Sequence, residues 1–436
     1  MHSDVAACGD ADAAESAFLP RFFAAKRGLF YALVFLAAFL IIFSRRPDAI
    51  LNAQFFAEDG QRWYADAYQF GLRCLLIPDE AGGYLHTMPR LAALLALLFP
   101  FRRAPLVMNL CGIVVQALPA VLVFSSRFSF VPFWIRLLGS FMYLGLPNSY
   151  GTNVNVTNIQ WHLALLAFLV LVAERANHRR WRFFDGLTLV LISVESPMGI
   201  LLVPVAAILW WLRRSHYALG LFGLMVPGAL LQCLVVLTSH VRQAAPNGAT
   251  FAGLVTILGR QVFLASLLGK DKVMHIALRY SAPSSFALEA AATALGLIAL
   301  AYAAGRAPVE LKLFIAFSFA VLALALIRPL AGAPGQPQWK WLCSPGTSNR
   351  YFYFPILAFF SALLWIAARA RPRAIRYGGA ALLVLCFVGV RRDWRYPAFE
   401  DMHFGEYASK FEAAPSGTEM VIPLNPAPWK MELTKR

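Results

Sequence analysis

The sequence predicts an all-α membrane protein that crosses the bilayer many times. Hydrophobic side chains make up 59% of its 436 residues and charged ones only 14%, and the mean hydropathy is +0.60. A soluble globular domain cannot bury so large an apolar share. Runs near the roughly 20 apolar residues that a helix needs to cross a bilayer recur along the chain, for example at 29–44, 105–124, 217–238, 286–304 and 352–368. These runs predict one membrane domain.

The chain is also strongly basic, with a formal net charge of +16 and an isoelectric point near 9.9. Its arginines stand in short clusters at the ends of apolar runs, which indicates membrane topology and no nucleic-acid partner. Arg21, Lys26 and Arg27 precede the first apolar run. The positive-inside rule therefore predicts a disordered cytoplasmic tail at 1–27.

The segment 45–103 should then lie outside the cytoplasm, as the first external loop. Within it, 84–101 is apolar but contains Pro89 and Arg90, so we expect a juxtamembrane helix and not a span. This choice keeps the cluster Arg175, Arg179, Arg180 and Arg182 in the cytoplasm. The segment 251–268 could span the membrane or lie on it.

The transmembrane domain at 28–390 is thus expected to be a bundle of about eleven helices, with a short periplasmic tail at 391–436. The expected helices are 28–44, 104–124, 133–147, 160–174, a Pro-interrupted pair at 187–195 and 198–212, 217–238, 286–304, 311–328, 351–368 and 375–390. The cytoplasmic loops are short and basic, whereas polar and turn-rich segments gather outside. Many arginines and lysines also lie outside, and this excess indicates an anionic partner.

Adjacent acids open the first external loop, QFFAEDGQRWYADAYQFG. Glu58 and Asp59, with Asp66 farther along, lie near the membrane surface among aromatic side chains. Acids in such a place suit general-base work on a hydroxyl, or the binding of a cation such as Mg²⁺ or Mn²⁺. A solvated pair that only orients the protein is the alternative.

The next block, GGYLHTMPRL, has glycines and a proline that impose a turn before a helix. It places His86 and Arg90 at the membrane interface, where an arginine can hold a phosphate by charge and by forked hydrogen bonds. For His86, a purely structural role is the alternative to substrate binding.

Amide side chains gather in PNSYGTNVNVTNIQWHLALL, at the opening of a helix. Asn155, Asn158 and Gln160 suit hydrogen bonding to sugar hydroxyls, although Asn158 equally fits a helix cap. Glu195 stands in an apolar stretch beside Pro197, where a helix must break. An ionisable group at membrane depth is a functional candidate, and the tip of a helical hairpin is the alternative.

The last external loop ends in GTSNRYFYFPIL, which places Arg350 beside Tyr351 at the start of a helix. Such an arginine is a natural counter-charge for a lipid phosphate at the bilayer surface. The alternative is that the side chain only extends toward water at a helix end.

These features resemble the GT-C superfamily of integral-membrane glycosyltransferases, which includes bacterial relatives of protein mannosyltransferases and aminoarabinose transferases. The resemblance covers nearly the whole chain. The blocks FFAEDG, GYLHTMPR, NVTNIQW, RYFYFP and VIPLNPAPWKMEL look like those of one bacterial branch. Where several members have a large soluble C-terminal domain, only 391–436 follows the last expected helix. Acceptor recognition is therefore expected in the loops or in a partner.

The resemblance implies transfer of a sugar from a polyprenyl-phosphate donor to a cell-envelope glycan or lipid acceptor, on the periplasmic side and with inversion. It implies that an acid of the first loop is the base, and by position Asp59 is favoured over Glu58. Arg350, with Arg90 as second choice and Tyr351 beside it, would neutralise the phosphate that leaves with the lipid. Some members need a divalent metal and others do not, and one acidic pair leaves this open.

Two other functions stay open. A non-catalytic membrane protein of this fold could bind or translocate polyprenyl-linked sugars, in which case the acids would tolerate replacement by amides. An O-antigen polymerase or acyltransferase ranks last, because such a polymerase typically has paired arginines in large later loops. Here the acids of the first loop are the more prominent feature.

Overall fold

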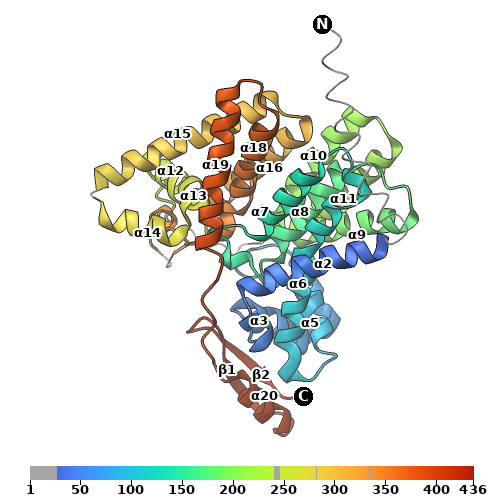
Figure 1. The fold of residues 1–436 in the computed structure, drawn as a ribbon. Coiled ribbons are helices and arrows are strands. Elements are labelled where there is room, and N and C mark those ends of the chain that lie inside the picture. The colour runs from blue at the N-terminus through green and yellow to red at the C-terminus, as the bar shows by residue number, and fades with distance from the viewer. Residues whose placement is uncertain (1–26, 240–245, 281, 333–334) are drawn as a thin grey trace.

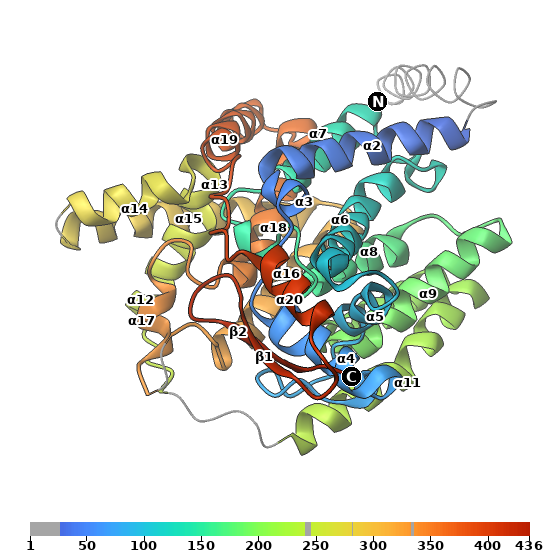
Figure 2. The same cartoon turned by 90° about the horizontal axis from the view of Figure 1, so that it is seen from below.

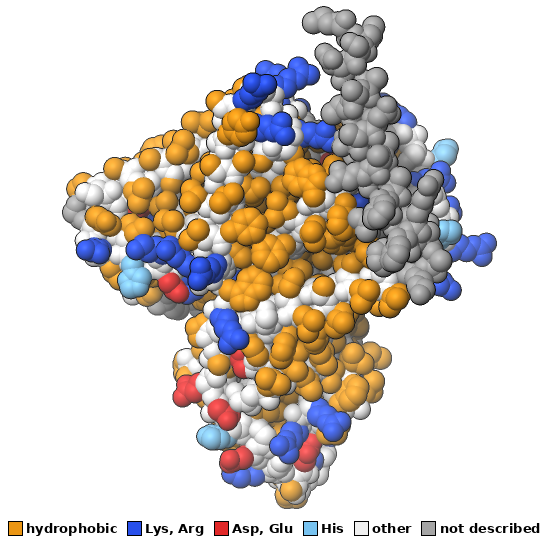
Figure 3. Space-filling view, in the orientation of Figure 1, with side chains coloured by type: hydrophobic (Ala, Val, Ile, Leu, Met, Phe, Trp, Pro, Cys, Tyr) orange, Lys and Arg blue, Asp and Glu red, His pale blue; other side chains and the backbone are white. Residues whose placement is uncertain are grey.

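The computed structural model describes residues 27–239, 246–280, 282–332 and 335–436, and these are mostly helical. Except for Arg27, the expected cytoplasmic tail lies outside the described residues. The long helices form a broad bundle, and below it the first external loop and the C-terminal segment form a smaller lobe (Figure 1). Hydrophobic side chains cover much of the visible face of the bundle, as expected of a surface in contact with lipid (Figure 3).

Each position at which the sequence predicts a span is helical in the structure. The helices are α2 (Arg27–Arg45), α6 (Ala104–Val123), α7 (Phe133–Leu144), α8 (Ile159–Val172), α9 (Arg179–Glu195), α10 (Pro197–Arg213), α11 (His216–Thr238), α15 (Ala282–Arg306), α16 (Val309–Ile327), α18 (Tyr353–Arg369) and α19 (Arg373–Arg392). The break between α9 and α10 falls at Ser196, whose side chain caps α10 ahead of Pro197 at its first position.

The expected number of eleven spans is not confirmed. Among the described residues, eight helical segments are long and apolar enough to cross a membrane. Helices α7, α8 and α10 are apolar but shorter, and one of the eight, Phe251–Leu268, was not among the expected spans. That segment comprises α12 (Phe251–Ile257), η7 (Leu258–Leu264) and α13 (Ala265–Leu268).

Two polar residues, Arg260 and Gln261, interrupt the apolar segment 251–268. In the structure, Arg260 donates to Glu289 of α15 at 2.6 Å, and the side chain of Gln261 donates to the backbone oxygen of Leu342 at 2.9 Å. Partners within the protein thus satisfy both polar side chains, which makes them tolerable in an apolar segment. The short helices α14 (Lys270–Arg279) and α17 (Gln338–Leu342) flank it.

The core of the bundle is centred on α8 and α18. Nearly every side chain of α8 is buried, which explains why its sequence is apolar on all sides and lacks an amphipathic stripe. Aromatic rings join the core helices, for example Phe317 of α16 and Phe354 of α18, whose centroids are 5.0 Å apart. Helices such as α11 and α19 instead leave large apolar side chains exposed, including Leu230 and Val384.

The described first external loop contains six short helices: α3 (Asp48–Leu51), η2 (Asp59–Tyr64), α4 (Ala65–Phe70), η3 (Gly71–Leu76), α5 (Thr87–Ala96) and η4 (Phe101–Arg103). The expected juxtamembrane helix is α5. Its ten residues extend only about 15 Å, which is too short to cross the bilayer. Leu91, Leu95 and Leu98 remain exposed on and just after α5, where they can contact lipid.

The C-terminal segment after α19 is folded and joins the same lobe. It contains α20 (Phe404–Ala413) and a hairpin of β1 (Glu419–Pro423) and β2 (Lys430–Thr434), in which Ile422 is opposite Met431. Seen from below, these elements lie across the first external loop (Figure 2). A hydrophobic cluster joins the two parts, with the ring of Phe404 5.2 Å from that of Phe55.

Candidate functional site

A cavity of about 530 Å³ opens between the helix ends of the bundle and the first external loop. Its size is within the range of pockets that hold small molecules. Its wall combines apolar side chains with a group of polar ones: Glu58, Arg62, Asp79, Tyr84, His86, Thr157, Asn158, Gln160, Arg328, Asn349, Arg350 and Tyr351. The cavity therefore brings together polar side chains from segments that are far apart in the sequence.

One wall is a tight turn that begins at Asp79. The Asp79 carboxylate accepts a hydrogen bond from the backbone N–H of Gly82, and the Asp79 N–H donates to the carbonyl of Tyr84 at 2.8 Å. Gly83 has a φ of +67°, and a Cβ on Gly82 would lie 2.4 Å from the Tyr84 ring. Glycines are thus required here, and they let Tyr84 turn into the cavity.

The two adjacent acids occupy different environments. Glu58 is half-buried and lines the cavity, whereas Asp59 is 1% exposed and does not line it. The Asp59 Oδ1 accepts two hydrogen bonds from Thr157, one from the backbone N–H at 3.0 Å and one from the hydroxyl. The geometry therefore favours Glu58 as the acid that can meet a substrate, although position in the sequence favoured Asp59.

Burial raises the pKa of Asp59 to about 7, and the hydrogen bonds from Thr157 oppose this shift in part. Its second oxygen, Oδ2, has no hydrogen-bond partner among the described residues. Thr157 in turn accepts a hydrogen bond from the indole N–H of Trp63 at 2.8 Å. Asp59 thus fixes the loop before α8 to η2, directly behind Glu58.

Arg350 is far from Glu58 in the sequence but lines the same cavity. Its guanidinium carbon is 4.9 Å from the centre of the Tyr351 ring, and it donates to the carbonyl of Leu330 at 3.2 Å. The negative charge of Glu58 acts on Arg350, so the carboxylate and the guanidinium are electrostatic neighbours. The two candidate residues from loops almost 300 residues apart are thereby brought together.

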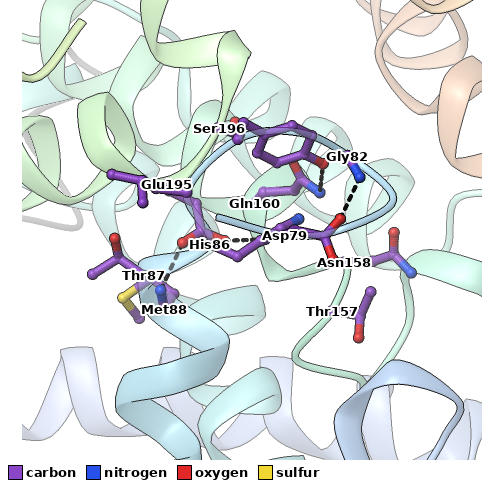
Figure 4. Close-up of polar contacts among 12 residues, drawn as sticks. Asp79, Gly82, His86, Thr87, Met88, Thr157, Asn158, Gln160, Glu195 and Ser196 are labelled. Atoms are coloured by element: carbon purple, nitrogen blue, oxygen red, sulfur yellow. Dashed lines mark hydrogen bonds and ion pairs between the residues drawn. The ribbon is translucent and has the colours of Figure 1, made fainter. Parts of the chain in front are cut away.

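Glu195 and His86 form a buried pair beside the cavity (Figure 4). The Glu195 Oε1 is 3.3 Å from Nδ1 of His86, and Oε2 accepts from the backbone N–H of Met88 at 2.6 Å. Because Met88 is in the first turn of α5, the carboxylate caps that helix and interacts favourably with its dipole. His86 reaches the cavity, but Glu195 lies behind it and positions α5.

Arg90 does not reach the cavity. It is 1% exposed, donates to Asp66 at 2.8 Å and to the carbonyl of Cys74 at 2.7 Å, and lies over the Trp63 ring. Asp66 likewise does not line the cavity. The structure thus assigns these contacts to holding α5 against α4 and η3.

Of the three amide residues predicted to bind substrate, two line the cavity and one does not. Asn158 and Gln160 line the cavity, and Gln160 donates to the Tyr84 hydroxyl at 3.3 Å. Asn155 is buried behind the wall, where its side chain donates to the carbonyl of Gly151 at 2.7 Å and accepts from the N–H of Asn158. Asn155 therefore shapes the loop and does not face a ligand.

Two cavity-lining donors lack a hydrogen-bond partner in the described part of the chain. The indole N–H of Trp161 and the side-chain nitrogen of Asn349 are buried, and neither has a hydrogen-bond partner among the described residues. Buried donors are seldom left unpaired, so both are available to a ligand oxygen. Together with Arg350 they form a donor group suited to an oxygen-rich anion.

The side chains around the cavity do not form a clear set of ligands for a divalent metal. The described residues contain no group of three or more His, Cys, Asp or Glu side chains that could hold a metal ion. Asp79 also lines the cavity, but it is paired with Arg62 and bonded to Gly82. We therefore assign no chemical step to Mg²⁺ or Mn²⁺.

Sequence reasoning did not single out Asp79, Tyr84, Trp161 or Asn349 as site residues. The glycines after Asp79 signal a turn, but nothing in the spacing links that turn to Arg62. Trp161 and Asn349 stand next to residues that were singled out, Gln160 and Arg350. Their orphaned donors become visible only in three dimensions.

The sequence matches no known protein-family model, and a comparison with curated proteins finds no relative.

Proposed function

We propose that this chain is a glycosyltransferase of the GT-C type. It moves a sugar from a polyprenyl-phosphate donor to a glycan or lipid acceptor of the cell envelope. The observation that carries this proposal is that a carboxylate, Glu58, and a guanidinium, Arg350, line one cavity at the end of a membrane-spanning bundle. One group can accept a proton and the other can stabilise a phosphate.

In the proposed reaction, the Glu58 carboxylate accepts the proton of the acceptor hydroxyl. The oxygen then attacks the anomeric carbon of the sugar, and the bond from that carbon to the phosphate oxygen breaks. The phosphate leaves on its lipid with the bonding electron pair, and Arg350 stabilises its negative charge. A single displacement inverts the configuration at the anomeric carbon.

The remaining wall suits the two substrates. The donor N–H groups of Trp161 and Asn349 would bind oxygens of the phosphate or sugar, and Asn158 and Gln160 would bind sugar hydroxyls. Apolar residues such as Leu324 and Ile327 of α16 line the same cavity. They give the first isoprenoid units of a lipid donor an apolar surface beside the phosphate.

The proposed orientation places the cavity on the periplasmic side of a bacterial inner membrane, with the N-terminus in the cytoplasm and the C-terminus outside. It is supported by the basic clusters at the opposite helix ends, among them Arg213 at the end of α10 and Arg369 at the end of α18. We keep the expected bundle of about eleven helices as part of this proposal. In it, the shorter α7, α8, α9 and α10 cross alongside the longer helices, and Phe251–Leu268 is not counted as a crossing.

Transfer of radiolabelled sugar from native polyprenyl-linked donors, in membranes with matched amounts of each variant, tests the proposal. Wild type should transfer label, and Glu58→Gln should not. Transfer by both proteins alike would refute Glu58 as the base. Binding of the donors by wild type without transfer to any acceptor would favour a non-catalytic carrier of polyprenyl-linked sugars.

A further inference from the structure

A second cavity lies inside the bundle at the end away from the candidate site. It has a volume of about 660 Å³, and residues of α6, α7, α8, α16 and α18 line it. Helix α18 begins at Tyr353, near the first cavity, and ends at Arg369, which lines the second. Helix α16 runs the other way, from Glu310 at the second cavity to Ile327 at the first. The two cavities thus occupy opposite ends of the same helices.

The lining of this second cavity is almost entirely apolar, with rings and branched chains such as Phe168, Phe314 and Leu357. Water gains few hydrogen bonds in such a space. The remaining occupant of matching chemistry in a membrane is a hydrocarbon chain. Tyr143 also lines the cavity, and its hydroxyl donates to the carbonyl of Gln116 at 2.7 Å.

Two polar atoms in this apolar wall have no hydrogen-bond partner in the part of the chain that the structure describes. The Nε of Arg136 and the hydroxyl of Ser140 are buried and lack hydrogen-bond partners among the described residues. Ser140 is 8% exposed, and both residues line the cavity. They are four residues apart on α7, so they lie on one face of that helix. An anionic lipid fits this arrangement, because its headgroup can accept a hydrogen bond from the unpaired guanidinium nitrogen and its chains can fill the apolar cavity.

The charges around this end agree with an anionic ligand. Among the described residues, Arg136 has no carboxylate within ion-pair distance, and its guanidinium carbon lies 5.8 Å from the centre of the Phe133 ring. The cavity wall carries one acid, Glu310, and two arginines, Arg136 and Arg369. Lys and Arg side chains also gather at the top of the bundle, near the ends of α18 and α19 (Figure 3). Such a basic end attracts the anionic lipids of a leaflet.

We infer that this cavity is a binding site for one anionic glycerophospholipid, whose acyl chains fill the space between α7, α8, α16 and α18 and whose phosphate accepts hydrogen bonds from Arg136 and Ser140. The site is separate from the proposed catalytic cavity and does not depend on the function proposed for it. Its ligand is a lipid of the leaflet at the basic end of the bundle.

Gly139 offers a way to fill the cavity without disturbing the fold. It lines the cavity on α7, and a Cβ built there meets no heavy atom closer than 3.8 Å, a methyl group of Leu364. Leucine is also a better helix former than glycine. Gly139→Leu should therefore fold and occupy the space that the lipid chains need.

The test compares purified wild type, Arg136→Gln and Gly139→Leu, with Arg179→Gln as the control. Arg179 is an exposed arginine at the start of α9, at the same basic end. Each protein is titrated with phosphatidylglycerol or with phosphatidylcholine of identical chains. Bound lipid is counted by native mass spectrometry, and thermal unfolding is followed in parallel.

We expect wild type and Arg179→Gln to retain one phosphatidylglycerol in preference to phosphatidylcholine. Arg136→Gln should lose about tenfold in affinity for phosphatidylglycerol, because a charge-assisted contact is removed. Gly139→Leu should retain neither lipid while unfolding no lower than wild type in detergent. Equal retention of both lipids by wild type, or unchanged retention by Gly139→Leu, would overturn the inference.

Discussion

The carboxylate of Asp59 accepts hydrogen bonds from both the backbone N–H and the hydroxyl of Thr157, although the two residues are 98 positions apart in the sequence. This contact ties the first turn of η2 to the loop before α8. Glu58, one residue earlier, is left on the cavity wall. The adjacent acids therefore have separate tasks, and the variants below distinguish them.

Asp59→Asn should stabilise the protein in a pH-dependent way. The pKa of Asp59 is about 7 in the folded protein, against 3.8 for an ordinary carboxyl group, so its ionisation costs wild type stability as the pH rises from about 4 to 7. An asparagine can still accept the bonds from Thr157 but has no charge to bury. The stability advantage of Asp59→Asn should grow over this window by at most roughly 4 kcal/mol and then level off. Unfolding at several pH values measures it, and an advantage that is constant with pH would contradict the assignment.

Arg90→Gln should damage the fold, whereas Arg350→Gln should not. Removing the buried guanidinium of Arg90 leaves the Cys74 carbonyl and Asp66, which is 26% exposed, without their donor, at a cost of about 2–3 kcal/mol. Arg350 instead lines the cavity and contacts the protein through Tyr351 and one carbonyl. Thermal unfolding of the two variants beside wild type makes the comparison. A stable Arg90→Gln protein would show that the pair is not structural.

Arg350→Gln should weaken binding of a polyprenyl phosphate. A hydrogen bond to a charged group contributes about 1.5–3 kcal/mol, which corresponds to a loss of roughly 10- to 150-fold in affinity. The measurement is titration of the variant with the lipid phosphate in detergent. Arg371→Gln, an exposed arginine just after α18, serves as the control. Equal affinities of wild type and Arg350→Gln would remove Arg350 from the phosphate site.

Trp161→Phe should lower substrate affinity without lowering stability. The phenyl ring keeps the contacts with Tyr353 and Phe354 but has no N–H, and the indole N–H has no partner within the described protein. If a ligand oxygen accepts from this group, affinity should fall about three- to tenfold. Unchanged affinity together with unchanged stability would show that the indole N–H is not used.

Leu424→Ala should loosen the first external loop through the C-terminal segment. Leu424 is 2% exposed and packs against Gly60, and the next residue, Asn425, accepts a hydrogen bond from the N–H of Ala57 beside Glu58. The substitution should cost about 2–4 kcal/mol and reduce transfer through displacement of Glu58. Hydrogen exchange at 55–64 measures the loosening. Val421→Ala, on the exposed side of β1, is the matched control.

The bundle could be predicted from the sequence because apolar runs and basic clusters are local signals. The segment 251–268 stayed ambiguous because the partners of Arg260 and Gln261, such as Glu289 and Leu342, come from later parts of the chain. The folding of the C-terminal segment onto the first loop was not predicted for the same reason. It depends on contacts such as the one between Phe404 and Phe55.

The candidate site could be predicted in part. The blocks with Glu58, His86, Asn158, Gln160 and Arg350 do meet at one cavity. Spacing alone could not tell which of two adjacent acids faces it, because the backbone at Ala57 has a φ of +40° and the partner of Asp59 is distant. Spacing also could not show that Arg90 forms an ion pair with Asp66.

The most direct test of the account is sugar transfer by Glu58→Gln beside Asp59→Asn, in membranes that contain equal amounts of folded protein and labelled polyprenyl-linked donor. If Glu58 is the base, Glu58→Gln should lose roughly 100- to 10,000-fold in rate. Asp59→Asn should retain most of its activity, because Asp59 does not line the cavity. Full activity of Glu58→Gln would contradict the account.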